Sequence, residues 1–254
     1  MSHSSALPRQ FALDLSQTPP ASIHNFLVSG NEELKDAIEQ SIASWPLVST
    51  EDTNPLERRW LYWWGASGSG RSHLLQAISN AARGKSIRQS DLNPNQPNAW
   101  IDLEDQLSRL NNQEVIVITV DDVDQLDERL QGSLFRILNL VQACSRYFIY
   151  LAGTLAPHGL QLREDLRTRL AWGLIFQVHP LTDSEKVAAL SRAAKDRGLN
   201  LSADVLPWLI NHFYRDMPSL MAMIDALDAY SLETKRAITL PLVRELLQIA
   251  GNKK

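Results

Sequence analysis

The sequence predicts an α/β fold in which a doubly wound parallel sheet carries helices on both faces and is followed by a small all-helical domain. Apolar runs of strand length alternate with segments of helical spacing over the first part of the chain. A glycine-rich loop lies between the first such run and a helical segment, which is the context of a phosphate-binding loop. From Thr182 onward only helical spacing occurs. We therefore expect two folded domains of different architecture.

The beginning of the chain is polar and ends in Thr18-Pro19-Pro20, a sequence that cannot continue a helix. We expect residues 1–20 to be a flexible tail, residues 21–179 to form the α/β domain and residues 180–254 to form the helical domain. Within the tail, the apolar side chains of residues 10–15 alternate with small or acidic ones. This pattern allows either an edge strand or a short extended peptide that docks elsewhere.

The first elements after the tail are a helix, a strand and a second helix. Residues 31–40 have helical spacing with acidic side chains in the first turn, where they complement the helix dipole. Residues 60–64 form an apolar run of strand length, and residues 73–78 belong to a helix that begins near Arg71. The glycine-rich loop therefore connects a strand to a helix.

Three further apolar runs predict strands. Residues 114–120 are rich in β-branched side chains, as expected for a strand that is buried on both faces of a parallel sheet. Residues 147–152 form a similar run that ends in Gly153-Thr154, and residues 174–178 supply a final strand. Ligands of such sheets bind at the carboxyl ends of the strands, so the residues that follow the strands are the candidates for function.

The last part of the chain predicts a helical bundle. Its apolar residues recur at helical spacing over residues 184–194, 205–213, 219–227 and 241–247. Each of these segments can bury one apolar face against the others. We therefore expect a small helical domain.

Composition and charge exclude some classes of protein. No apolar stretch approaches the roughly 20 residues that span a bilayer, and the first residues lack the basic flank and apolar core of a secretory signal. We therefore expect a soluble, cytoplasmic protein with no membrane partner. The net charge of −4 disfavours a broad basic face that would hold duplex DNA by phosphate contacts alone. The single cysteine, Cys144, lies in an apolar helical run and is expected to be a small core residue without a disulfide partner.

Residues 64–73 reproduce a phosphate-binding loop at every fixed position except one. Gly65 and Gly70 let the backbone curl so that successive amide groups converge on phosphate oxygens, and Ser72 would supply a hydroxyl to Mg²⁺. Arg71 stands where lysine is expected, and its guanidinium can bind two phosphate oxygens, so nucleotide binding tolerates this change better than fast hydrolysis does. The simpler alternative is a Gly/Ser-rich turn. The full set of expected nucleotide contacts in this loop is Gly65, Gly68, Ser69, Gly70, Arg71, Ser72 and His73.

Two acidic residues, Asp121 and Asp122, end the buried strand over residues 114–120. Buried carboxylates are unfavourable unless a cation lies nearby, and Mg²⁺ bound to nucleotide phosphates is the obvious candidate. We expect Asp121 to hold Mg²⁺ through water. Asp122 would orient an attacking water, although it is one methylene shorter than the glutamate usual at this position. The alternative is that both acids cap the following helix.

Together these motifs resemble the AAA+ module of the DnaA-related family. The resemblance extends from about Ile23 to the C-terminus and rests on the loop over residues 65–72, the Asp121-Asp122 pair, residues 165–174 and the Arg215-Asp216-Met217 element. Within the family it is strongest to the regulators that inactivate DnaA, which are similarly short, carry arginine before Ser-His in the loop and open with a clamp-binding peptide. It implies that the sliding clamp, the β subunit of DNA polymerase III, binds the tail through Gln10, Phe11, Leu13 and Leu15, with Asp14 where proline is usual.

The resemblance also implies roles for single residues. Arg169 matches the arginine finger that reaches the γ-phosphate of a neighbouring subunit in trans, with an ordinary surface charge as the alternative. Arg215 matches the lid residue that senses the nucleotide, with a helix-terminal ion pair as the alternative. Thr154 takes the place of the polar residue that reports the γ-phosphate, and residues 23–29 resemble the segment that lines the adenine pocket.

The function implied by the resemblance is negative regulation of chromosomal replication initiation. The protein would bind ADP or ATP with Mg²⁺, with ADP favoured, dock on the DNA-loaded sliding clamp and stimulate hydrolysis of the ATP bound to DnaA. It would contact DNA only through the clamp and would hydrolyse ATP weakly by itself. The protein is also a candidate for association into a homo-oligomer. One alternative is a self-sufficient ATPase such as a helicase loader or a DnaA-like initiator, although no helix-turn-helix pattern follows before the chain ends near Gly251. Another is a nonenzymatic adaptor tethered to the clamp.

Overall fold

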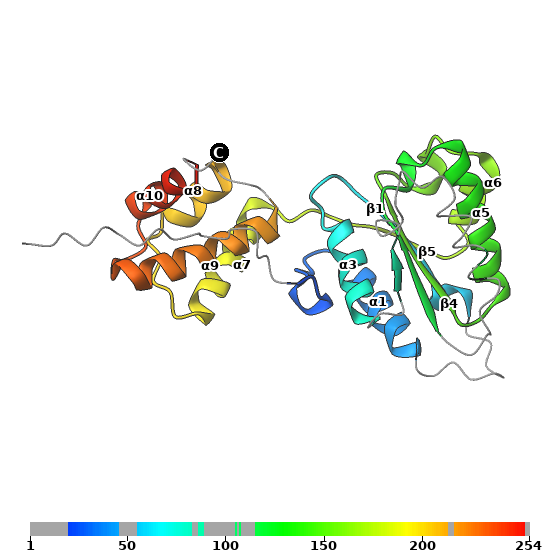
Figure 1. Cartoon of the computed structure of the whole chain (residues 1–254), viewed down its shortest axis with the longest axis horizontal. Helices are drawn as coiled ribbons and strands as arrows, with labels where there is room; N and C mark the ends of the chain where they lie inside the picture. The colour runs from blue at the N-terminus through cyan, green and yellow to red at the C-terminus, as the bar shows by residue number, and fades with distance from the viewer. Residues whose placement is uncertain are drawn as a thin grey trace, which may run out of the picture. The chain divides into compact units, whose positions relative to one another are not determined.

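The computed structural model describes residues 20–45, 55–82, 86–88, 105, 107, 115–212 and 216–251. These residues form two compact units that divide between Leu181 and Thr182. Among the described residues, the first unit contains the sheet and the second is built from helices (Figure 1). The predicted α/β fold followed by a helical domain is therefore confirmed.

The described strands form one parallel sheet in the order β2-β3-β4-β1-β5. Four of these strands coincide with the apolar runs that predict them. The short strand β2 carries no apolar pattern, because its three residues include serine and arginine. The bounds are β1 Trp60–Trp64, β2 Ser86–Arg88, β3 Ile116–Val120, β4 Tyr147–Gly153 and β5 Leu174–Gln177.

The strand order brings the carboxyl ends of β3, β4 and β1 next to one another. Val120 at the end of β3 pairs with Leu151 of β4, and Gly153 at the end of β4 pairs with Trp64 of β1. The strand-end acids, Thr154 and the phosphate loop consequently follow three adjacent strands. This is the edge of the sheet at which the sequence places the site.

Helices cover both faces of the sheet (Figure 1). One face carries α1 (Glu32–Ser44) and α3 (Arg71–Ala81), and the other carries α5 (Glu128–Ala143) and α6 (Glu164–Leu170). The predicted early helix and the helix after the phosphate loop are both confirmed. The shorter helices of this unit are α2 Leu56–Arg59, η1 Ile23–Asn25, η4 Val123–Gln125 and η5 Pro157–Gly159.

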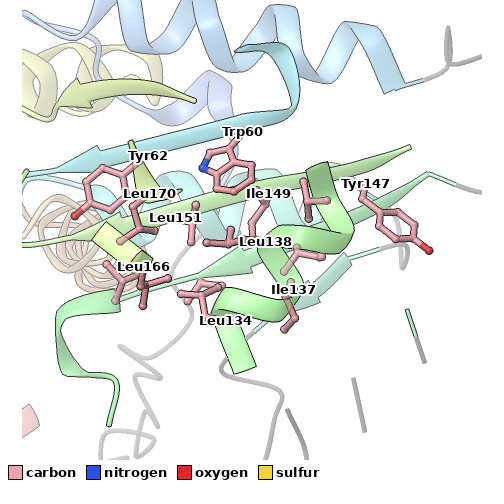
Figure 2. Packing of buried hydrophobic residues seen from close by; sticks show 14 of the residues in the cluster. Trp60, Tyr62, Leu134, Ile137, Leu138, Tyr147, Ile149, Leu151, Leu166 and Leu170 are labelled. Carbon is pink, nitrogen blue, oxygen red and sulfur yellow. The ribbon is translucent and has the colours of Figure 1, made fainter. Parts of the chain in front are cut away.

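The strands bury alternate side chains in two different cores. Trp60 and Tyr62 of β1 pack with residues of α5 and α6, whereas Leu61 and Trp63 pack with residues of α1 and α3. Figure 2 shows the first of these cores, in which the side chains of β1 and β4 meet those of the two helices. Every residue of β3 is buried, as its continuous β-branched run predicts. Full burial of one large apolar side chain contributes roughly 1.5–3 kcal/mol, so these two cores dominate the stability of the unit.

Arg59 fixes the end of α5 against β4. It is 5% exposed, and its Nη1 donates hydrogen bonds to the carbonyl oxygens of Cys144 at 2.8 Å and of Tyr147 at 3.2 Å. A cation at the C-terminus of a helix complements the helix dipole. Burial lowers the pKa of Arg59. Cys144 itself is the C-cap of α5 and is half-buried against the core, so it lies at the end of the helical run that predicts it.

The second unit has its own apolar core, built by residues of all its helices. Thr182 begins the first helix with a capping box, in which its side chain accepts from the Glu185 amide while the Glu185 carboxylate accepts from the Thr182 amide. Every helix predicted for this region is confirmed. No helix in the described part of the chain is both long and apolar enough to cross a membrane. The bounds are α7 Asp183–Asp196, α8 Val205–His212, α9 Met217–Thr234 and α10 Leu240–Gly251.

Candidate nucleotide-binding site

The phosphate loop joins β1 to α3 and closes in a tight turn. Gly70 precedes α3 with a φ of 98°, a left-handed conformation that residues with a side chain rarely adopt. A Cβ at this position would also lie 2.9 Å from Cε2 of Phe26. At Gly65, a Cβ would collide with the carbonyl oxygen of Val178. The loop therefore has the curled backbone that its glycines predict.

Two polar atoms of the loop, Ser69 Oγ and Arg71 Nη1, are buried and have no hydrogen-bond partner within the described residues. Buried polar atoms are normally bonded, so each is suited to a polar ligand. A phosphate oxygen would accept a hydrogen bond from either atom. The remaining expected contacts stand nearby in the chain, with Gly68 in the turn and Ser72 exposed in the first turn of α3. These unsatisfied donors make the loop a suitable binding site for a phosphate group.

Arg71 points toward Asp122 and is 8% exposed. Its Nη2 lies 3.4 Å from Oδ1 of Asp122, and its carbonyl oxygen accepts a hydrogen bond from Nε1 of Trp63 at 3.3 Å. The second contact fixes the start of α3 against β1. The ion pair is longer than the ~2.7–2.9 Å of a strong charge-assisted hydrogen bond, and it engages Nη2, so Nη1 remains available to a phosphate.

Asp121 and Asp122 take different positions after β3. Oδ1 of Asp121 accepts a hydrogen bond from the amide of Asp122 at 2.9 Å, and Asp122 has a left-handed φ of 43°. Partial burial and the Asp121 charge raise the pKa of Asp122, and Arg71 opposes this shift. The Asp122 side chain does not cap η4, while α5 is capped by Asp127, whose Oδ1 accepts from the Leu130 amide. The helix-capping alternative is therefore wrong for Asp122.

Thr154 follows β4 and is held by Asp124 of η4. The Thr154 amide donates to Asp124 Oδ1 at 3.0 Å, and the Thr154 hydroxyl donates to Asp124 Oδ2 at 3.1 Å. Burial alone would raise the pKa of Asp124, but hydrogen bonds from Thr154 and from the Gln125 side chain lower it overall. Asp124 has no motif signal of its own, because it is one of several acids after β3. Its hydrogen bonds to Thr154, directly after β4, are seen only in the folded chain.

The segment expected to line an adenine pocket packs beside the phosphate loop. Ser22 begins η1 with a capping box, and the buried Phe26 ring stacks on His73 with ring centroids 6.2 Å apart. Nε2 of His73 lies 3.3 Å from the carbonyl oxygen of Ser22. Burial lowers the pKa of His73, and the Ser22 contact opposes this shift. His73 therefore ties residues 22–26 to the first turn of α3.

Arg169 lies in α6 and is half-buried. Its guanidinium carbon lies 4.1 Å from the centroid of the Phe135 ring and 4.8 Å from that of Trp172. Its Nη1 is buried and has no hydrogen-bond partner within the described residues. The side chain is therefore held by two aromatic rings and keeps an unused donor. Phe135 and Trp172 carry no sequence signal for this role, since aromatic residues in apolar runs predict core packing.

Some expected site residues lie outside the described residues. These are the lid residue Arg215 and the tail residues Gln10, Phe11, Leu13 and Leu15. No group of three or more His, Cys, Asp or Glu side chains in the described ranges is arranged to hold a metal ion. The expected Mg²⁺ site uses only Ser72 and Asp121 from the chain, and it stays a prediction.

The chain matches two family models. Residues 19–177 match the bacterial DnaA ATPase domain, and residues 183–247 match the Hda lid domain. An uncharacterized protein of Haemophilus influenzae is 29% identical over 246 residues, which cover 95% of this chain and 99% of that protein.

Solved structures of DnaA share the fold. Aquifex aeolicus DnaA bound to AMPPCP superimposes with a TM-score of 0.61 at 21% identity, covering 85% of this chain and 67% of that one. Domain III of the Thermotoga maritima replication initiation protein DnaA superimposes with a TM-score of 0.60 at 20% identity, covering 91% of this chain and 96% of that one. The chain spans 66% of the length of a crystallised DNA replication initiation factor.

Proposed function

Because the chain belongs to the DnaA-related AAA+ family, we propose that it is a negative regulator of replication initiation that acts on DnaA in trans. In its nucleotide-bound form it docks on the DNA-loaded sliding clamp through Gln10, Phe11, Leu13 and Leu15. It then stimulates hydrolysis of the ATP bound to DnaA and leaves the initiator in its ADP form. The observation that carries this proposal is the joining of a DnaA-type ATPase domain to an Hda-type lid in one chain.

The chain's own nucleotide site has a binding role in this proposal. The loop amides, Ser69 Oγ and Arg71 Nη1 hold the phosphates of ADP or ATP, because these buried donors need acceptors. Ser72 and Asp121 offer the oxygen ligands that Mg²⁺ prefers. Weak hydrolysis by the chain itself follows from Asp122, which is one methylene shorter than the usual glutamate and has Oδ1 at 3.4 Å from Nη2 of Arg71.

Arg169 supplies the activity toward DnaA. A finger must present guanidinium hydrogen atoms to a phosphate on another molecule without reorganising when that molecule arrives. The two rings beside Arg169 restrain the guanidinium, so it needs little reorganisation to act on a partner. Its role as an arginine finger rests on this arrangement and on the family resemblance.

The proposal is tested by measuring hydrolysis of ATP already bound to DnaA. Clamp, DNA and this chain are present together or omitted one at a time, and hydrolysis should accelerate only when all are present. Arg169→Ala should lose this stimulation while it still folds, binds nucleotide and binds the clamp. Arginine fingers of GTPases contribute roughly 10³ to 10⁵ in rate, so the loss should be large.

Arg163→Ala is the matched control for Arg169→Ala. Arg163 also lies near the Phe135 ring, at 6.0 Å, but its guanidinium is ion-paired with Asp165 at 2.6 Å. This variant should stimulate DnaA as the parent chain does. If Arg169→Ala stimulates as well as the parent, Arg169 is not the finger, and if the parent never stimulates, the regulator role itself is wrong.

A further inference from the structure

One carboxylate engages both hydrogen-bond donors of the residue expected to report a γ-phosphate. Asp124 accepts from the Thr154 amide at 3.0 Å and from the Thr154 hydroxyl at 3.1 Å. The two residues are 30 positions apart in the chain, and they lie in η4, which follows β3, and directly after β4, which is next to β3 in the sheet. Thr154 therefore has neither donor directed to a ligand in this state.

This contact lies next to the start of the phosphate loop. The Gly65 amide donates to the carbonyl oxygen of Gly153 at 3.3 Å, so the residue before Thr154 touches the first glycine of the loop. The Cβ of a side chain at position 153 would lie 3.3 Å from Asp124 Oδ1, which places that carboxylate at the same corner. Asp124 and Thr154 consequently border the space beyond the loop.

The donors at this edge divide into two groups. Ser69 Oγ and Arg71 Nη1, inside the loop, have no partner within the described residues. Thr154 and Nη2 of Arg71 are already paired with the carboxylates of Asp124 and Asp122. In the binding mode that the proposed function assumes, a diphosphate on the loop uses the first group and leaves both pairs intact. A third phosphate group must either face these carboxylates or break the pairs, and like charges at short range are repulsive.

We propose that Asp124 is a specificity-determining residue of the nucleotide site. By holding Thr154, it favours a nucleoside diphosphate over the triphosphate. This inference rests on the proposed nucleotide binding and adds to it the residue that discriminates. Asp124 acts through Thr154 and through its own charge, whereas the loop supplies the affinity common to both nucleotides.

Titration calorimetry of the full chain, stripped of nucleotide, tests this role with ADP and ATP in the presence of Mg²⁺. In Asp124→Ala, the ratio of ATP affinity to ADP affinity should rise about tenfold, because two donors become available and one negative charge is removed. The affinity for ADP should stay within about threefold of that of the parent. Asp124→Asn keeps the size of the side chain and one acceptor for the Thr154 amide, so its ratio should lie between the two.

Two further variants separate the contact from a general effect of charge. Glu128→Gln removes a negative charge from an exposed position in the first turn of α5 and should leave the ratio unchanged. Asp124→Ala combined with Thr154→Val should lose part of the gain seen in Asp124→Ala, because the freed hydroxyl is then absent. Thermal unfolding confirms that each variant is folded before titration.

The outcomes distinguish this inference from the proposed function. An unchanged ratio in both Asp124 variants, or an equal rise in Glu128→Gln, overturns the role of Asp124 while nucleotide binding stands. A parent chain that binds neither nucleotide overturns the nucleotide site and this inference together. Stimulation of DnaA is measured separately and does not depend on the ratio.

Discussion

Arg71 and Asp122 set the character of the nucleotide site, because each departs from the residue usual at its position. Asp122 adopts a left-handed φ of 43°, which costs a residue with a side chain about 1 kcal/mol or more. Its carboxylate meets the Arg71 guanidinium at 3.4 Å, and its amide is bonded to Asp121. The strained backbone of Asp122 thus lies where the acidic pair after β3 meets the phosphate loop. We propose that the Arg71–Asp122 pair weakens ATP hydrolysis by the chain more than it weakens nucleotide binding.

Arg71→Ala should lose most of the rise in melting temperature that ADP or ATP gives the parent chain. A ligand at 100 times its Kd stabilises the folded state by about 2.7 kcal/mol, and removal of the buried cation weakens binding to the phosphates. Asp122→Asn removes only the partner of Arg71, so it should retain the nucleotide-dependent shift. If Arg71→Ala retains it as well, the guanidinium does not hold phosphate. If the stripped parent shows no shift, the adaptor alternative gains support.

At the scale of elements, one carboxylate adds polar contacts to the apolar packing of α9 and α10 in their shared core. Glu245 of α10 accepts from Nη1 of Arg236 at 2.8 Å and from Oη of Tyr230 at 2.8 Å. Lys235 is the C-cap of α9 and has a left-handed φ of 53°. Hydrogen bonds from Arg236 and then from Tyr230 lower the pKa of Glu245. The pair of helices is therefore held best when Glu245 is ionised.

Low pH should weaken the contacts of Glu245 with Arg236 and Tyr230, because protonation removes the charge of the carboxylate. Because the folded pKa of Glu245 lies below its unfolded value, its contribution is present above that unfolded value and is lost as pH falls through the folded pKa. Glu245→Gln should consequently melt at a lower temperature than the parent at pH 7, and the difference should shrink in acid. Circular dichroism at both pH values measures this. Glu233→Gln, an exposed change on α9, should show no such convergence, and a constant gap for Glu245→Gln would contradict the assignment.

At the scale of the whole molecule, the proposed regulator combines a tail, an α/β unit and a helical unit. Two hydrogen bonds hold Pro20 and Ala21: Nδ2 of Asn25 donates to the Pro20 carbonyl at 3.1 Å, and Nδ2 of Asn80 donates to the Ala21 carbonyl at 2.8 Å. These contacts tie the point where the predicted tail ends to η1 and α3. Clamp binding and nucleotide binding are thus assigned to different residues of one chain.

Changing Gln10 and Leu13 together to alanine should abolish clamp binding and leave nucleotide binding intact. Short peptides bind through a few anchor side chains, so two truncations remove most of the affinity. Immobilised clamp should capture the parent and a Ser4→Ala/Ser5→Ala control, but not the double variant. Equal capture of all three would show that the tail motif is not the clamp ligand.

The sequence by itself determined β1, β3, β4 and β5 and the helices of the second unit, in their order, but not the short strand β2. The strand, loop and helix around Gly65 and Gly70, the buried β3 strand and the helical second unit follow from apolar spacing and from the backbone freedom of glycine, which are local properties. Only the tertiary structure decided which side chains meet. Arg71 reaches Asp122 across 51 positions, Asp124 reaches Thr154 across 30, and Arg169 is held by Phe135. These contacts depend on which strands are neighbours in the sheet. The local sequence around these residues does not distinguish them from other acidic and aromatic residues of the chain.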